Sequence, residues 1–530
     1  MCQLHRKPLI GFLIGLLAIF SVSCDSQLEE EPDFINSETF FKDAQSLETA
    51  VNGAYQNLNG DRWFRFFYDR FVFEELAGYQ VGWEKGPLDF QNGNVSPTDQ
   101  YIEAYWNLSY EAINRANTVV AQAQRLEGEV GNEALRQRVL AEAKFLRSFY
   151  YFNLIRYFDD VPFKVKPAEQ LSFPSNEDGE RKVLDMMFAD LQDAAEVLPS
   201  QYDGDDAGRA TKWAAKTLLM KAYLKDEQWT QARGAAEDII TNSPHRLYDD
   251  FGRNFSIADE NDPDGERIFE IQVSASADAG ENSNTHAHYV PPDHEFGQGW
   301  HWLWTTKQYR MRYDEDDRRI PGTFLQSYKS VRPQGASAEN LATVNWSPDA
   351  EFSLGRFNGV VDENADADNS DELIYSGGWS RKRVEDCGGR NCWASTEKNI
   401  VMLRFADVLL GHTEASLEGG GGGQFDKYFG INRVRERAGL STLSGLSTEA
   451  LRDSLVNEYM LEFTFENKSY SFLRRKSTFN GDPDPLGEQI QRFIDNHDVD
   501  RQVKQRDYAL PIPPEEVRGN ENVQQHPFWR

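Results

Sequence analysis

Basic residues are scarce relative to acidic ones in this chain of 530 residues. It contains 56 Lys and Arg against 86 Asp and Glu, so its formal net charge is -30. Such a surface repels the phosphates of nucleic acids, which argues against a DNA or RNA partner. Neutral sugars need no basic site and remain candidate ligands. After the N-terminal segment, no stretch is apolar enough to span a bilayer.

The sequence also lacks the short motifs of several enzyme classes. It has no Gly-x-Ser-x-Gly elbow, no His-Glu-x-x-His and no phosphate-binding glycine loop. The glycine run 419–423 has no Lys-Ser/Thr after it, so we interpret it as a hinge between helices. The acidic run 362–372 contains no glycine and fits no calcium-binding loop, so we expect no metal and no cofactor. A glycosidase needs only two carboxylates, which no motif would mark, so that alternative stays open.

The N-terminus carries an export signal. The basic segment His5-Arg6-Lys7 precedes an apolar run over residues 9–20, which is too short for a membrane span and is followed by Cys24. A cysteine at this point is where a bacterial lipoprotein is cleaved and acylated. We therefore expect a soluble body tethered at Cys24 by acyl chains. The alternative is an ordinary signal peptide followed by an incidental cysteine.

Only four cysteines are present, and two of them belong to the N-terminal segment. Cys2 leaves with the signal peptide and Cys24 takes the lipid. Cys387 and Cys392 remain, separated by four residues, and in an oxidising compartment they can close a small loop as a disulfide. No histidine lies near them, so a zinc site is the poorer explanation.

Helical periodicity dominates the rest of the chain. Helices are expected from a cap at Ser46, over residues 105–126 and over residues 135–158. Residues 213–223 and 229–240 form the clearest pair, with small residues at the crossing, as in tetratricopeptide-like hairpins. Residues 399–417 and 425–438 suggest a second pair. On these helices we expect three tryptophans to be core residues: Trp106, Trp213 and Trp229.

These patterns predict a mainly α fold, a tetratricopeptide-like helical hairpin scaffold with loop-rich insertions and a few short strands. We divide the chain into a signal peptide (1–23), a flexible acidic tether (24–36) and a single domain (37–530). A Pro-, Gly- and Asp-rich insertion covers about 244–396, with a strand-like run at 268–273, and residues 59–99 are loop-like. Insertions in a rigid scaffold commonly form a binding face.

Six blocks, in order, resemble the SusD/RagB family of starch-utilisation-type lipoproteins. The first is the Ala-, Phe- and Tyr-rich helix 140–152 with Val161-Pro162, and the second is Gly208-Arg209-Ala210-Thr211. The others are 267–270, 403–410, 432–440, and 508–513 with 524–527. The resemblance covers nearly the whole chain after Cys24. It implies a non-catalytic, tetratricopeptide-like protein on the outer face of the outer membrane that caps a TonB-dependent (SusC-like) barrel transporter.

Aromatic residues supply the candidate ligand site, because a sugar ring stacks its apolar face on an aromatic plane and offers hydroxyls at its edge. In an extended segment, alternate residues of 300–304 would share one face, while His301 could meet hydroxyls. One or more of these indoles could instead anchor the loop. The glycan-binding candidates are Tyr79, Trp83, Trp300, His301, Trp302, Trp304 and Trp379.

We therefore expect a glycan-binding surface lipoprotein that delivers its ligand to the transporter. The acidic composition favours neutral or cationic sugars, although the basic run 381–383 could favour polyanions. The alternatives are a glycoside hydrolase and a purely structural helical scaffold for the transporter complex.

Replacing Cys24 tests the anchor. In a Cys24→Ala variant no acyl chain can be attached, so the protein should move from the membrane fraction to the soluble fraction. Fractionation with immunoblotting measures this, with Cys2→Ala, a change inside the signal peptide, as the control. A Cys24→Ala protein that stays in the membrane fraction would contradict lipidation.

Overall fold

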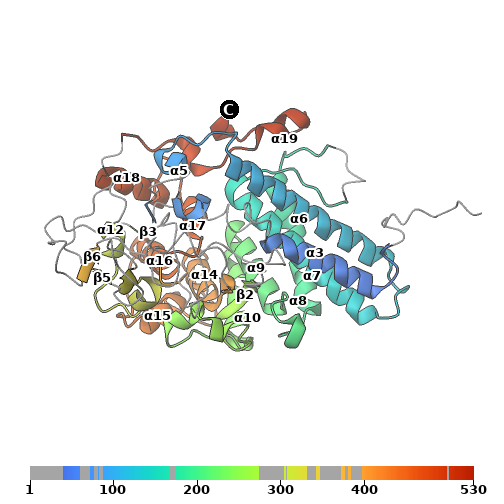
Figure 1. Cartoon of the computed structure of the whole chain (residues 1–530), viewed down its shortest axis with the longest axis horizontal. Coiled ribbons are helices and arrows are strands. Elements are labelled where there is room, and N and C mark those ends of the chain that lie inside the picture. Colours follow the sequence, from blue (N-terminus) through green and yellow to red (C-terminus); the bar gives the residue numbers. More distant parts are fainter. Residues whose placement is uncertain are drawn as a thin grey trace, which may run out of the picture.

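The computed structural model describes most of the chain after its N-terminal segment, and the protein is mainly helical (Figure 1). No helix in this part of the chain is both long and apolar enough to cross a membrane. The described residues are 40–59, 72–76, 81–82, 88–167, 173–273, 304–305, 307–330, 342–346, 372–375, 380–382, 397–497 and 500–530.

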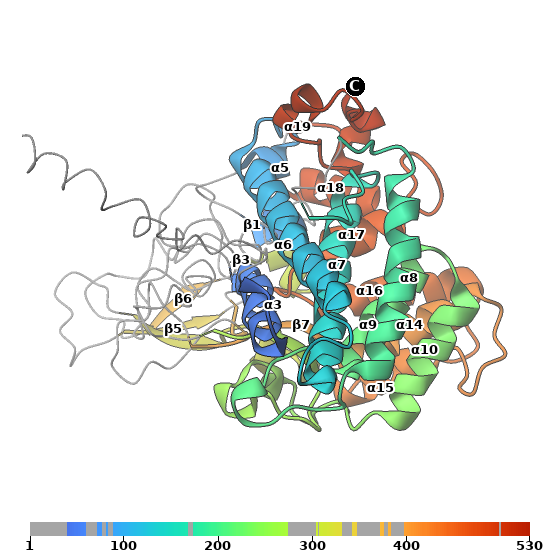
Figure 2. The same ribbon diagram turned by 90° about the vertical axis from the view of Figure 1, so that its right-hand side faces the viewer.

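Consecutive helices pack on one another and form a continuous stack (Figures 1 and 2). Each helix buries one face against its neighbours, so the apolar core runs through the whole stack. The predicted mainly α fold class is confirmed. In chain order the stacked helices are α3 (Ala44–Asn59), α6 (Gln100–Arg125), α7 (Glu133–Phe158), α8 (Gly179–Val197), α9 (Lys212–Lys225), α10 (Trp229–Asn242), α14 (Phe405–Glu418), α15 (Phe429–Arg437) and α16 (Thr448–Glu462).

The caps of the helices explain where the sequence analysis was right and wrong. Thr211 caps α9 by accepting a hydrogen bond from the backbone N–H of Ala214, at the start predicted for this helix pair. Helix α6 begins five residues before the predicted start, because Asp99 accepts from the N–H groups of its first turn. Ser46 is not a cap. Its N–H donates to Asp43 Oδ1 at 2.8 Å, so it already lies within the first turn of α3.

The predicted helix start at residue 399 is wrong. Residues Ile400–Arg404 form strand β7, which pairs antiparallel with β2 (Arg267–Ile271). Both strands are buried along their whole length, and the apolar, partly β-branched run suits a strand that is covered on both sides. Helix α14 starts only at Phe405. The strand-like run predicted near residue 268 is confirmed as β2.

The described part of the insertion consists of short elements. Strand β5 (Ala342–Trp346) lies between β4 (Ser327–Ser330), antiparallel, and β6 (Glu372–Tyr375), parallel. Strand β1 (Val81–Gly82) pairs with β3 (Trp304–Thr305). The region predicted as loop before residue 99 also holds a π-helical turn, η1 (Val72–Leu76), and helix α5 (Leu88–Asn92). The remaining short helices of the insertion are η4 (Phe251–Phe255), η5 (Ile257–Asp259), α12 (Lys307–Arg310) and α13 (Ile320–Thr323).

The C-terminal part returns over the helical stack. Its helix α19 (Pro514–Gly519) lies beside the upper end of α6 in Figures 1 and 2, near the C-terminus. The N–H of Leu510 donates to Tyr157 O at 2.9 Å, which joins the last segment to the end of α7. The elements are α17 (Ser469–Arg475), α18 (Pro485–His497), η6 (Gln505–Tyr508), α19 (Pro514–Gly519) and η7 (Pro527–Trp529); η3 (Gly204–Asp206) precedes α9.

Two of the three tryptophans predicted in the core are buried. Trp106 and Trp213 are 2% and 3% exposed. Trp229 packs on the core but is only partly buried, because it begins α10 beside a cavity described below. The prediction is therefore confirmed for two residues and too strong for the third.

A fully buried ion-pair network joins the insertion to the helical stack. Arg404 donates to Glu266 at 2.6 Å and to Glu466 at 2.8 Å, and also contacts Glu462. Arg437, on α15, binds Glu266 and Glu462 as well. Each carboxylate thus has cationic partners in a region without water exposure, and removal of one cation leaves a buried charge uncompensated.

The same network extends to two basic residues of the insertion. Arg319 binds Asp317 at 2.7 Å and reaches Glu462 at 3.1 Å. Lys382 is 1% exposed and donates to Glu466 at 2.6 Å. Lys382 therefore cannot contribute to a basic surface patch at 381–383, because its ammonium group lies inside the fold.

Arg404→Met should destabilise the protein strongly. The apolar side chain fills similar space but leaves Glu266, Glu462 and Glu466 with less compensation, at a cost of about 3–5 kcal/mol. Urea unfolding at pH 7 measures the free energy of unfolding. Arg518→Met, which removes an exposed ion pair with Glu515, should leave that free energy within error. Equal effects of the two substitutions would show that burial of the network has no energetic role.

Candidate functional site

Most of the residues predicted to bind ligand lie outside the described part of the chain, so their predicted roles stay predictions. Trp304 alone has a described backbone, in β3. The residues outside are Tyr79, Trp83, Trp300, His301, Trp302 and Trp379, together with Cys24, Cys387 and Cys392.

The backbone brings two of the predicted aromatic segments together. Strand β1 pairs antiparallel with β3, with Val81 opposite Thr305 and Gly82 opposite Trp304. Trp83 follows Gly82 in the chain, and Trp300 and Trp302 precede Trp304. The two chain segments were predicted as separate candidates. The pairing of residues 81–82 with residues 304–305 joins them in one two-stranded β-ladder.

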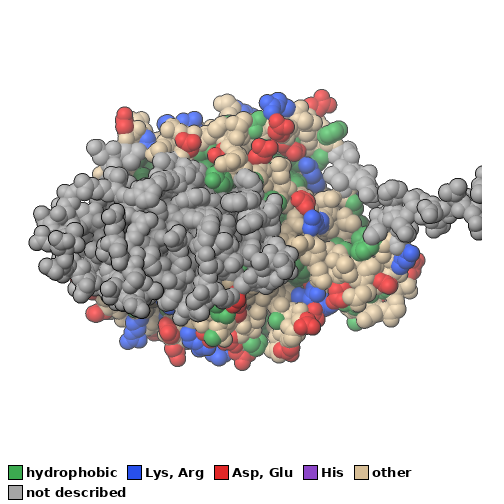
Figure 3. All heavy atoms as spheres, in the orientation of Figure 1, with side chains coloured by type: hydrophobic (Ala, Val, Ile, Leu, Met, Phe, Trp, Pro, Cys, Tyr) green, Lys and Arg blue, Asp and Glu red, His purple; other side chains and the backbone are tan. Residues whose placement is uncertain are grey.

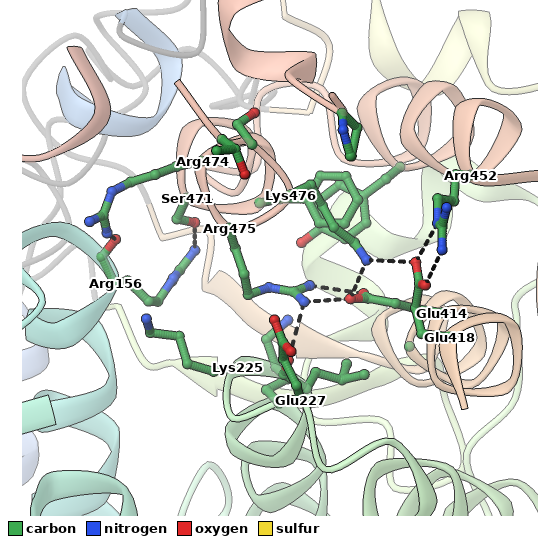
Figure 4. A pocket seen from close by; sticks show the side chains of 18 of the residues that line it. Arg156, Lys225, Glu227, Glu414, Glu418, Arg452, Ser471, Arg474, Arg475 and Lys476 are labelled. Carbon is green, nitrogen blue, oxygen red and sulfur yellow. Dashed lines mark hydrogen bonds and ion pairs between the residues drawn. The ribbon is translucent and has the colours of Figure 1, made fainter. Parts of the chain in front are cut away.

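A second feature, which the sequence analysis missed, is a cavity of about 770 Å³ in the helical stack. We call it the charged cavity (Figure 4). It lies among the C-terminal end of α7, the turn between α9 and α10, and helices α14, α16 and α17. More basic than acidic side chains line it, although the whole chain is strongly acidic. The basic residues are Arg156, Lys221, Lys225, Arg452, Arg474, Arg475 and Lys476.

Glu414 and Glu418, one turn apart on α14, organise one side of the charged cavity (Figure 4). Arg475 donates a hydrogen bond to each carboxylate oxygen of Glu414, and Lys476 donates to the same carboxylate at 2.8 Å. Arg452 binds Glu418 at 2.7 Å. Burial raises the pKa of the Glu414 carboxyl, but the charges and hydrogen bonds of Arg475 and Lys476 outweigh burial and lower that pKa to about 2.

Asp159, the residue that ends α7, organises the opposite side. It accepts from Arg474 and, at 3.0 Å, from His526. Burial raises the pKa of the Asp159 carboxyl, yet Arg474 and the hydrogen bond from His526 bring it well below the usual range. Arg156 donates to Glu74 at 2.7 Å, so its charge is also compensated, by a carboxylate from the π-helical turn.

Asp407 and Lys221 also line the charged cavity, and this carboxylate is shared with a second lysine, Lys468, which is buried outside the lining. Asp407 accepts from Lys221 at 2.8 Å and from Lys468 at 2.7 Å. Burial lowers the pKa of the Lys468 ammonium to about 8, against the opposing attraction of Asp407. The pKa of Asp407 lies far below the usual range, because the two ammonium groups outweigh the effect of its burial.

This arrangement offers hydrogen-bonding groups rather than acid–base catalysis. A glycosidase general acid needs a raised pKa, whereas the pKa of Asp159, Asp407 and Glu414 is lowered. Burial raises the pKa of Glu260 to about 7, but that carboxylate accepts the N–H of Asn399 at 2.6 Å and does not line the charged cavity. In the described part of the chain, no group of three or more His, Cys, Asp or Glu side chains is placed to hold a metal ion.

One sequence signal could have pointed to the charged cavity. Arg474, Arg475 and Lys476 are three consecutive basic residues beside the aromatic Phe472, in a chain poor in basic residues. Their partners Asp159 and Glu414 lie far away in the sequence, so no local pattern could have identified them.

Comparisons with known proteins agree with the fold. A family model described as "SusD family" matches residues 265–529, and one described as "Starch-binding associating with outer membrane" matches residues 26–224. A SusD-like protein of Formosa agariphila is 27% identical over 546 residues, which cover 98% of each chain.

Two solved structures show the same architecture. A SusD superfamily protein from Bacteroides vulgatus has a TM-score of 0.70 at 21% identity, covering 93% of this chain and 100% of that one. A surface glycan-binding protein A from Bacteroides fluxus has a TM-score of 0.69 at 19% identity, covering 91% and 99%. At these identities the likeness establishes the fold alone.

The lowered pKa of Glu414 predicts acid sensitivity. Its folded pKa of about 2 lies below the ordinary 4.5, so the ionised group stabilises the fold above pH 4.5, and this contribution is lost as the pH falls toward 2. In urea unfolding, wild type should lose about 2 kcal/mol between pH 5 and pH 3 that Glu414→Gln does not lose.

The matched control is Glu227→Gln. Glu227 lines the same cavity but makes no ion pair within the described chain, so this variant should follow the wild-type pH dependence. A Glu414→Gln protein with the wild-type pH profile would show that the carboxylate is not held by Arg475 and Lys476.

Proposed function

The chain belongs to the SusD family, and from that premise we propose that it is a cell-surface glycan-binding lipoprotein that delivers its ligand to a TonB-dependent outer-membrane transporter. The ligand is an oligosaccharide or polysaccharide, and the protein forms no product from it. The anchor is the acylated Cys24, and the acidic tether 24–36 separates the anchor from the helical body.

The observation that carries this proposal is the pairing of β1 with β3. Gly82 lies opposite Trp304 in the ladder, so the segment that continues into Trp83 starts beside the segment that contains Trp300, Trp302 and Trp304. Aromatic residues carried by two neighbouring chain segments would suit a saccharide, which presents apolar C–H faces to stack on and hydroxyls at its edges. Loops on a rigid scaffold are a common place for such a site.

Charge supports a neutral ligand. The chain carries a net charge of -30, and acidic and basic side chains are interspersed over the described part of the face in Figure 3. The basic residues of the charged cavity are held by carboxylates, so they provide no free positive surface for a polyanion. The matching family described as starch-binding at the outer membrane, and the similar fold of a surface glycan-binding protein, support this proposal.

Trp83→Ala and Trp300→Ala test the proposed site. Loss of one stacking ring should weaken oligosaccharide binding about tenfold, since aromatic contacts of this kind contribute about 1 kcal/mol or more. Isothermal titration against a panel of neutral hexasaccharides (α-1,4-glucan, β-1,4-glucan, xylan and mannan) measures the affinity. Trp83→Phe keeps a planar ring and should retain most of it.

Chromatography of the incubated sugars completes the test, and unchanged chain lengths are expected. Shortened chains would make the protein a hydrolase. Unchanged affinity in both alanine variants, together with unchanged growth on the glycan, would favour a structural scaffold instead.

A further inference from the structure

A second hollow lies between α6 and the C-terminal segment. Its volume is about 450 Å³, and it shares no lining residue with the charged cavity. The first turns of α6, residues 173–174 and helix α19 surround it. Figures 1 and 2 both show α19 beside the upper end of α6. We call it the α6–α19 hollow.

The hollow has one exposed aromatic ring. Phe173 is 71% exposed, the highest value among the large apolar side chains exposed in the described part of the chain. Its backbone is held firmly: Asn522 Nδ2 donates to Phe173 O at 3.0 Å, and Asn520 Nδ2 donates to Pro174 O at 2.9 Å. The C-terminal segment therefore presents this ring to solvent on a bonded backbone.

Polar groups with free hydrogen-bonding capacity face the same space. Glu103 and Asn107 lie one turn apart on α6, both exposed, and neither side chain has a partner within the described chain. Glu516 binds Lys164 at 3.3 Å, and Glu515, which is exposed on α19, binds the likewise exposed Arg518 at 2.8 Å. The lining thus combines acceptors, an amide and one ammonium group.

A buried donor at the hollow also lacks a partner. Trp106, between Glu103 and Asn107 on α6, is 2% exposed, lines the hollow, and its indole nitrogen makes no hydrogen bond. Because this nitrogen is itself buried, it is not one of the groups through which the hollow would bind a ligand.

We propose that the α6–α19 hollow is a second saccharide-binding site, in which Phe173 stacks on the apolar face of a neutral sugar ring and Glu103, Asn107 and Glu515 accept or exchange hydrogen bonds with its hydroxyls. The proposal rests on the glycan-binding function above. The lining holds three carboxylates and one ammonium group, and even with Arg518 paired to Glu515 the acidic groups are in excess, which disfavours anionic sugars. A protein partner fits less well, because Phe173 is the one large exposed apolar side chain of the described residues at this hollow, and a stable interface needs a larger apolar centre.

Two sites on one molecule raise the affinity for a ligand that is long enough to reach both. A polysaccharide that reaches both sites is held with a higher effective concentration at the second site once the first is occupied, whereas a short oligosaccharide occupies each site independently. The second site should therefore matter more for the polymer than for the hexasaccharide.

The experiment titrates the soluble form of the protein, which keeps the whole domain 37–530. The ligands are the hexasaccharide that binds with the highest affinity in the panel and its parent polysaccharide. Wild type should bind two hexasaccharides, and Phe173→Ala should bind one and lose at least fivefold in affinity for the polysaccharide. Phe173→Trp should keep both sites. Met311→Ala, which truncates another exposed apolar side chain away from the hollow, should match wild type.

The outcomes separate the two proposals. Wild-type binding of one hexasaccharide, unaltered by Phe173→Ala, overturns the second site and leaves the glycan-binding function intact. Loss of transporter co-purification in Phe173→Ala with unchanged sugar binding makes the hollow a protein contact and also overturns it. No binding of any panel sugar by wild type overturns both. In a Trp83→Ala background, residual hexasaccharide binding that Phe173→Ala removes supports the second site.

Discussion

The arrangement of the insertion on the helical stack depends on the contacts of Arg404 with Glu266, Glu462 and Glu466. Its guanidinium leaves strand β7 and meets carboxylates that come from the start of β2 and from the end of α16. Because none of these groups reaches water, each is stable only while the others stay in place. The network therefore ties the roots of the insertion to the helical stack.

This tie has a consequence for the binding region. Strands β2 and β7 mark where the described chain leaves the helical stack and returns to it, and their pairing holds these two points together. Residues between the two strands also reach back into the core, since Arg319 binds Glu462 and Lys382 binds Glu466. The insertion is therefore anchored to the helical stack at several points along its length and not only at its two ends.

Charge is distributed differently in the charged cavity and in the α6–α19 hollow. In the charged cavity, basic side chains and carboxylates neutralise one another, so Arg475 and Lys476 stabilise the packing of α17 on α14. In the α6–α19 hollow, Glu103 and Asn107, which have no partner within the described chain, line the same space as the exposed ring of Phe173. Free polar groups beside an aromatic plane are suited to recognition, and fully paired ones to structure.

The sequence by itself determined the helical fold class, the hairpin of α9 and α10, and the family blocks, because periodicity and caps such as Thr211 are encoded within a few residues. It misplaced the starts of α6 and α14, where a cap at Asp99 and the pairing of β7 with β2 decided the boundary. Only the tertiary structure decided that Lys382 is buried, that Glu414 meets Arg475, and that Gly82 lies opposite Trp304. These partners are distant in the chain, and their meeting depends on the packing of every element between them.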